Sequence, residues 1–183
     1  MFDKLFGLPA HPLLIHAPIV LLPILVIVTV VLAVRADWRR RAGWWATAAL
    51  GLLVVLVFAA KQSGEAFIEG FDRAYGAGAI DIEEHEEFAD TTMLLTIVWF
   101  AVFGVLVTAE WFARRGTTVA DSDGRDGSSD AAPARIMAKP AVSYGLAGVA
   151  TVLAVLSTVW MIRTGHEGAR VTWEPQVDQL FPD

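Results

Sequence analysis

Four long stretches of the chain are apolar on every side, without a repeating polar position. They cover residues 13–34, about 43–60, about 88–112 and 141–162. A bilayer core about 30 Å thick needs roughly 20 apolar residues in a helix that rises about 1.5 Å per residue. Helices of a water-soluble bundle carry a polar stripe, which these stretches lack. The pattern therefore predicts an all-α fold, an integral membrane four-helix bundle.

The flanking residues extend these stretches into longer helices within a single transmembrane domain. We expect helices at about 12–34, 43–68, 82–114 and 140–164. Asp81 and Glu84 form the D-x-x-E pattern of a helix start, so Asp81 should cap the third helix. Residues 115–139 are rich in Ser, Asp, Gly and Ala without apolar periodicity, which is typical of a flexible loop. No long internal repeat is evident.

Positive charge is concentrated in two of the three loops. The first loop carries four arginines, and the third carries four arginines and a lysine, whereas the second holds two basic residues among eight carboxylates. Positive loops stay in the cytoplasm. We therefore expect both chain termini and the second loop outside a bacterial cytoplasmic (inner) membrane. Trp38, Trp44, Trp45 and Trp111 then form an aromatic belt at the inner interface.

Composition removes several classes of function. The chain has 183 residues, a net charge of −6 and no cysteine. A nucleic-acid partner is therefore not expected, and disulfides, thiolate metal sites, cysteine nucleophiles and c-type haem attachment are excluded. No phosphate-binding loop, nucleotide fingerprint or nucleophile with an adjacent base is present. Whether the protein is an enzyme is left undecided.

All four histidines fall at the same, outer end of the predicted bundle. His11 and His16 begin the first helix, His85 begins the third, and His166 follows the fourth. They occupy a slab on the order of 10–15 Å deep. We expect His16 to face the bundle interior, because lipid offers it no hydrogen-bond partner. His11 should lie at the solvated entry, beside Pro12.

This convergence suggests a haem b or transition-metal site. A bis-histidine haem would take His16 with His85 or His166, and Arg163 or Arg170 would pair with the propionates. A bare zinc, copper or iron site would use several imidazoles and one carboxylate. The candidate metal ligands are His11, His16, His85, His166 and Glu65.

Two alternatives remain open beside the metal site. The histidines of a non-enzymatic structural or accessory subunit would only satisfy helix ends and the carbonyls freed by Pro18 and Pro23. Ion or proton transport is less well supported, because Asp90 and Glu110 lie near the ends of the third stretch, in interfacial positions. The acidic second loop would suit a basic redox protein or respiratory subunit as partner. A homo-oligomer is compatible with all these readings.

Three motifs resemble the bacterial transmembrane family called domain of unknown function 2231. They are H-P-L-L-I-H-A-P-I at 11–19, a histidine opening the third helix, and G-H-E-G-A-R at 165–170. The resemblance covers nearly the whole chain as four helices, although Ala17 stands where the family usually has an aromatic residue. It implies a bacterial membrane protein, sometimes fused to redox domains, and supplies no established activity.

Overall fold

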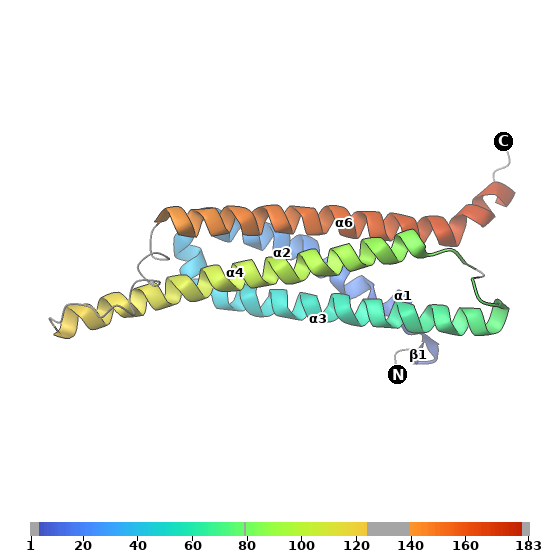
Figure 1. Ribbon diagram of the computed structural model, residues 1–183, viewed down its shortest axis with the longest axis horizontal. Coiled ribbons are helices and arrows are strands. Elements are labelled where there is room, and N and C mark those ends of the chain that lie inside the picture. The colour runs from blue at the N-terminus through green and yellow to red at the C-terminus, as the bar shows by residue number, and fades with distance from the viewer. Residues whose placement is uncertain (1–3, 79, 124–139, 181–183) are drawn as a thin grey trace.

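A computed structural model describes residues 4–78, 80–123 and 140–180, and four long helices make up most of the molecule (Figure 1). A two-stranded hairpin, β1 (Lys4–Leu5) and β2 (Leu8–Pro9), precedes a short helix, α1 (Ala10–Leu14). The long helices follow as α2 (His16–Val34), α3 (Ala36–Tyr75), α4 (Glu83–Asp123) and α6 (Pro140–Leu180).

Four helical segments are long and apolar enough to cross a membrane by length and composition. They are Ala10–Val34, Ala36–Tyr75, Glu83–Arg115 and Pro140–Glu174. Large apolar side chains on their outer faces are exposed, among them Val20, Ile27, Val55 and Leu94. Such side chains are stable on an outer surface when lipid rather than water surrounds the protein. The predicted all-α membrane bundle is confirmed.

Three of the long helices extend beyond the limits that the sequence suggested. α3 begins at Ala36 and ends at Tyr75, and α6 continues to Leu180 through the glycines at 165 and 168. A glycine inside a helix costs only about 1 kcal/mol relative to alanine, so favourable packing can retain it. α4 includes 115–123, which we had assigned to a flexible loop, and 124–139 lie outside the described residues.

The first membrane helix is interrupted at Ile15, between α1 and α2. The Ile15 N–H still donates to the carbonyl of His11 at 3.1 Å, and the Ile19 N–H donates to the carbonyl of Ile15 at 3.2 Å. Pro18 has no N–H to donate to the carbonyl of residue 14, so one bond of the helical ladder is missing here. The break leaves His11 on a separate turn that packs against α3.

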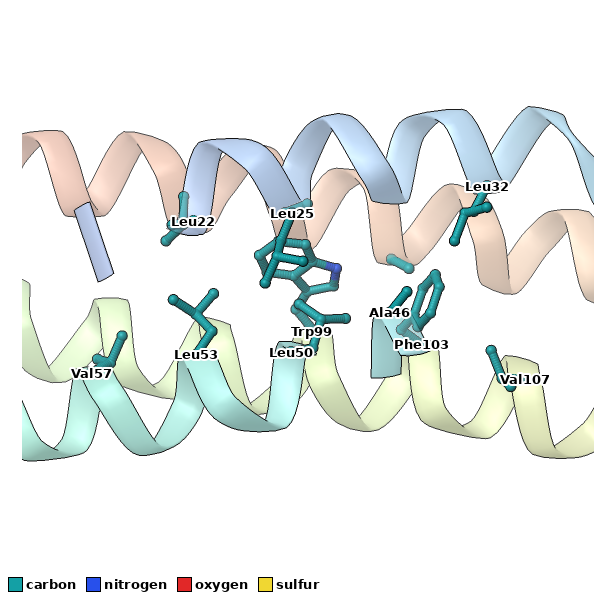
Figure 2. Packing of buried hydrophobic residues seen from close by; sticks show 12 residues of the cluster. Leu22, Leu25, Leu32, Ala46, Leu50, Leu53, Val57, Trp99, Phe103 and Val107 are labelled. Carbon is teal, nitrogen blue, oxygen red and sulfur yellow. The ribbon is translucent and has the colours of Figure 1, made fainter. Parts of the chain in front are cut away.

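The four long helices form a ring in which each packs against two neighbours. α2 contacts α3 and α6, and α4 contacts the same two helices. The core between them is apolar, and its largest fully buried side chains include Leu22, Leu50, Trp99 and Phe103 (Figure 2).

The buried positions of the helices recur along the chain at constant spacings, although the residue types at these positions mostly differ. The buried positions of α2 recur in α4 at a constant spacing of 74 residues: Pro18 and Thr92, Leu22 and Thr96, Leu25 and Trp99, Thr29 and Phe103, Leu32 and Leu106. Five of the eight buried positions of α3 recur in α6 at a spacing of 104: Gly43 and Ala147, Ala46 and Ala150, Leu50 and Ala154, Leu53 and Ser157, Ser63 and Glu167. The chain therefore consists of two equivalent hairpins, an N-terminal hairpin (α1, α2 and α3) and a C-terminal hairpin (α4 and α6).

The ring of helix contacts has the symmetry expected of two equivalent hairpins. An approximate two-fold rotation along the bundle exchanges α2 with α4 and α3 with α6, and it maps every neighbouring pair onto another neighbouring pair. Parallel repeats of this kind are known among membrane transport proteins. Here the repeat makes each residue of one hairpin comparable with a partner position in the other.

Candidate functional site

The candidate site lies at the end of the bundle where α3 ends and α4 begins, on the right in Figure 1. We call it the histidine end, because His11, His16, His85 and His166 all belong to it. Two of these rings, those of His11 and His85, pack against a neighbouring helix, and the other two are exposed.

His11 connects α1 to α3. Its ring Nδ1 lies 3.0 Å from the carbonyl oxygen of Ala60 and 3.3 Å from Oγ of Ser63. The ring lies against Gly64, where an added Cβ would meet the ring Cε1 at 3.1 Å. His11 is half-buried, so our expectation that it lies at a solvated entry is wrong.

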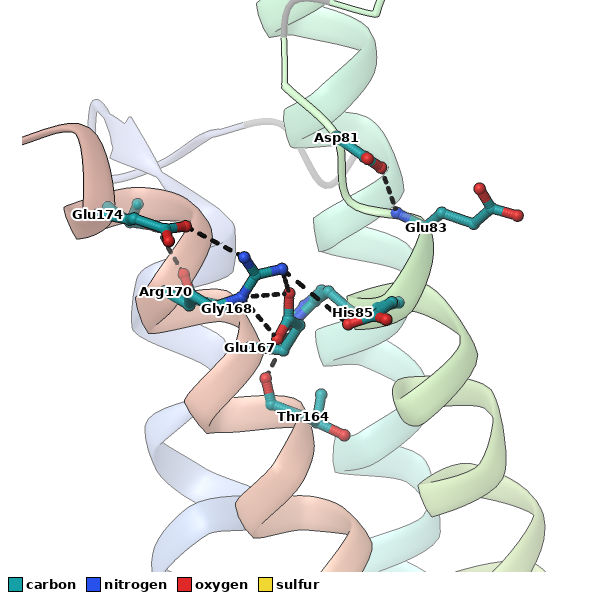
Figure 3. Close-up of polar contacts among 10 residues, drawn as sticks. Asp81, Glu83, His85, Thr164, Glu167, Gly168, Arg170 and Glu174 are labelled. Carbon is teal, nitrogen blue, oxygen red and sulfur yellow. Dashed lines mark hydrogen bonds and ion pairs between the residues drawn. The ribbon is translucent and has the colours of Figure 1, made fainter.

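His85 connects α4 to α6 in the same manner (Figure 3). Its ring Nδ1 lies 3.0 Å from the carbonyl oxygen of Thr164. The ring lies against Gly168, where an added Cβ would meet the ring Cε1 at 2.9 Å. The Thr164 hydroxyl also lies 3.2 Å from that of Thr92, which adds a second polar contact between the two helices.

The two contacts occupy equivalent positions of the repeat. His11 and His85 are 74 residues apart, and both the accepting carbonyls (Ala60 and Thr164) and the glycines (Gly64 and Gly168) are 104 apart. We call them the N-terminal clamp and the C-terminal clamp. In each, a carbonyl in the body of a helix accepts a hydrogen bond from an imidazole, and the glycine four residues later lets the ring approach.

The hydrogen bonds also determine the tautomer of each clamp histidine. A carbonyl oxygen only accepts, so Nδ1 must carry the proton in both rings, and Nε2 keeps its lone pair when the ring is neutral. The site is thus a pair of oriented imidazoles, one from each hairpin.

One difference between the clamps introduces a charge, because Ser63 of the first corresponds to Glu167 of the second. The Glu167 side chain is only 8% exposed and forms an ion pair with Arg170. Arg170 Nε lies 3.0 Å from both Glu167 oxygens, and its Nη1 lies 3.1 Å from Glu174 (Figure 3). An open pocket of about 430 Å³ adjoins this pair and is lined by Asp81, Glu83, Glu84, Glu87, Glu167 and Arg170.

His16 and His166 do not join the clamps. His16 is exposed, and its Nδ1 lies 2.6 Å from the carbonyl oxygen of Pro12 in its own turn, so the prediction that it faces the bundle is wrong. Residues five apart do not share a helix face. Because His11 packs inward against α3, His16 is directed outward. His166 is exposed on α6.

The ligand set expected from the sequence is not assembled. Glu65 accepts hydrogen bonds from Lys61 at 2.6 Å and from Gln62 at 2.8 Å. Over the described ranges, no three His, Cys, Asp or Glu side chains are grouped so that they could hold a metal ion. Arg163 stacks over the ring of Phe88 with its guanidinium carbon 4.4 Å from the ring centroid. The two candidate arginines, Arg163 and Arg170, therefore both have protein partners.

Sequence reasoning missed a buried ion pair at the opposite end of the bundle. Arg39 Nη2 lies 2.6 Å from Oε1 of Glu110, and the Arg39 side chain is 1% exposed. Its Nη1 also donates to the carbonyls of Leu32 at 2.6 Å and Ala33 at 3.1 Å, at the C-terminus of α2. We had placed Glu110 at the interface. A carboxylate inside an apolar stretch was the available signal that a buried cation faces it.

Comparison with known proteins gives one family match. The model of a family described as predicted membrane protein (DUF2231) matches residues 7–179. No curated protein and no solved structure matches the chain.

Proposed function

The chain belongs to the DUF2231 family of predicted membrane proteins, and from this premise we propose that it is a non-enzymatic accessory subunit of the bacterial cytoplasmic membrane. In this proposal the histidine end faces outward, and the clamp histidines hold the helix ends in a fixed arrangement. The observation that carries the proposal is the equivalence of the two clamps, each of which uses Nδ1 to bind a backbone carbonyl of the neighbouring helix.

The clamp geometry supports a fastening role. An imidazole that donates to a carbonyl satisfies its own polar N–H where few water molecules reach it. The glycine beneath each ring leaves no gap, so the ring contributes packing as well as a hydrogen bond. One such contact in each hairpin stabilises the polar end of both helix pairs.

An accessory subunit acts together with another protein, and the histidine end offers an acidic surface for such a partner. The histidine end carries the acidic residues around the open pocket, among them Asp81, Glu83 and Glu84. A basic redox protein or respiratory subunit would be attracted to this surface, and its association would weaken as salt screens the charges.

A second candidate function is the binding of haem b or of a single zinc, copper or iron ion. It is favoured by the tautomer of His11 and His85, in which Nδ1 carries the proton and Nε2 keeps its lone pair. Metal-ligating histidines commonly use one nitrogen for a carbonyl and the other for the metal. His11 and His85 would supply two imidazole ligands through Nε2, a kind of ligand that haem iron and transition metals accept. However, no histidine lines the pocket beside Glu167 and Arg170, and none lines a second pocket at the other end of the bundle, beside Arg39 and Arg114.

Substitution by asparagine distinguishes the two candidates. An asparagine amide can donate to the carbonyl from nearly the position of Nδ1, but it offers no imidazole Nε2 to a metal. If the histidines are clamps, His11→Ala and His85→Ala each lower the free energy of unfolding by about 1–3 kcal/mol, and the asparagine variants recover part of this loss. His16→Ala and His166→Ala serve as exposed controls and should change it little.

The absorption spectrum and metal content of the purified protein complete the test. The clamp proposal expects no Soret band and no stoichiometric metal after growth with excess haem precursor and metal salts. A Soret band, or one equivalent of metal, that disappears in His11→Asn and His85→Asn would reject it in favour of the second candidate.

A further inference from the structure

A second pocket lies at the opposite end of the bundle, which we call the arginine end. It has a volume of about 280 Å³, and its lining includes Arg39, Arg40, Glu110, Arg114, Ser143 and Tyr144. Three arginines face one carboxylate in this lining, so the pocket is cationic. We propose that it binds the phosphate headgroup of one anionic phospholipid.

The internal repeat explains why the pocket forms at this position. Ala36 and Pro140 are the first residues of α3 and α6 and occupy equivalent positions, as do Arg39 and Ser143, and Arg40 and Tyr144. The pocket therefore lies where the two equivalent helices begin. The N-terminus of a helix carries a partial positive charge and favours a phosphate group. Two such ends contribute here, in addition to the arginines.

The arginines have different roles in the pocket. Arg39 is neutralised by Glu110 and anchored to the end of α2, so it forms a rigid part of the wall. Arg40 forms an ion pair with Asp37 at 2.5 Å, and both side chains are well exposed. An exposed pair of this kind is worth little, so Arg40 can exchange the carboxylate for a phosphate at small cost. Arg114 lines the same opening from α4.

The position of the pocket along the bundle, at the level of the lipid headgroups, favours a lipid over a soluble anion as the ligand. Exposed aromatic side chains surround this end of the bundle: Trp38, Trp44, Trp45, Phe112 and Tyr144. Tryptophan and tyrosine concentrate at the headgroup level of a bilayer. A cationic pocket between membrane helices at that level suits an anionic phospholipid, whose acyl chains would lie along the exposed apolar faces of the helices.

Native mass spectrometry of the full-length protein, released from detergent with added phosphatidylglycerol or phosphatidylcholine, tests the proposal. We expect one phosphatidylglycerol to be retained in preference to phosphatidylcholine. Arg40→Gln and Arg114→Gln should each weaken its retention about fivefold. Arg73→Gln is the matched control, because Arg73 is exposed at the histidine end and donates to a carbonyl of its own helix. It should leave retention unchanged.

A third variant keeps the test decisive if either arginine variant folds poorly. Ser143→Asp adds a carboxylate to the lining without removing a cation, and it should also lower retention of phosphatidylglycerol. Equal retention of the two lipids, or unchanged retention in all three variants, would overturn the proposal. Displacement of phosphatidylglycerol by millimolar inorganic phosphate would also overturn it, since the pocket would then be a site for free anions.

Discussion

The imidazole ring of His85 lies directly on Gly168, so closely that a methyl group added to this glycine would meet the ring at 2.9 Å. The contact joins α4 to α6 at the point where His85 Nδ1 donates to the carbonyl of Thr164 at 3.0 Å. It explains why a glycine stands inside a long membrane helix at this position.

Gly168→Ala should therefore destabilise the protein. The new methyl group would displace the ring and break its hydrogen bond, at a cost of about 1–3 kcal/mol in the free energy of unfolding in detergent micelles. Gly165→Ala is the matched control, because nothing lies within 4 Å of a Cβ added there. It should be neutral or stabilise the helix by up to about 1 kcal/mol. Equal effects of the two substitutions would contradict the clamp.

The buried pair of Arg39 and Glu110 should behave as a coupled unit. Arg39→Met leaves a carboxylate without its cation and should cost about 3–5 kcal/mol, whereas Arg39→Met combined with Glu110→Leu should recover much of that loss. A double-mutant cycle on the free energy of unfolding measures the coupling. Arg40→Gln, which breaks the exposed pair with Asp37, should cost less than about 1 kcal/mol. Additive effects of Arg39→Met and Glu110→Leu would refute the coupling.

The proposed orientation can be tested by labelling, since the chain contains no cysteine of its own. Cysteines placed at Ala77, between α3 and α4, and at Ser128, between α4 and α6, should react with a membrane-impermeant reagent from opposite sides. Ala77 should label in intact cells, and Ser128 only after the membrane is opened. Labelling of both from the same side would show that the topology is wrong.

Asp81 should stabilise the start of α4. Its Oδ1 accepts a hydrogen bond from the N–H of Glu83 at 3.2 Å, which satisfies one of the free donors of the first turn. Asp81→Ala should weaken the helix start by about 1 kcal/mol and raise the rate of hydrogen exchange over residues 82–88. Asp72→Ala, which affects the end of α3 instead, controls for general loosening of the connection. Unchanged exchange in the Asp81 variant would exclude the cap.

The repeat of the two hairpins is clear in the packing and hidden in the residues. Leu25 is equivalent to Trp99, and Leu50 to Ala154, so equivalent buried positions carry side chains of different size. Core packing constrains the total volume of the buried side chains, and many combinations of apolar residues can supply the same volume. The histidine and the glycine of the clamps are the same in both hairpins, because a hydrogen bond and a close approach require particular residue types.

The class of this protein follows from its amino-acid sequence alone. Four uninterrupted apolar stretches leave a membrane bundle as the stable arrangement, and the positions of the histidines along them bring all four to one end. Which of the histidines turn inward depends instead on how the helices pack. His16 lies within the apolar run and looked buried, whereas the break at Ile15 and the room above Gly64 allow His11 to pack inward instead. The position of a residue in the sequence determines its level along the bundle. The direction of its side chain depends on where the neighbouring helix offers a carbonyl to accept a hydrogen bond and room for the ring. The pairing of Arg39 with Glu110 follows the same rule, because they are far apart in the sequence and meet only when α3 packs on α4.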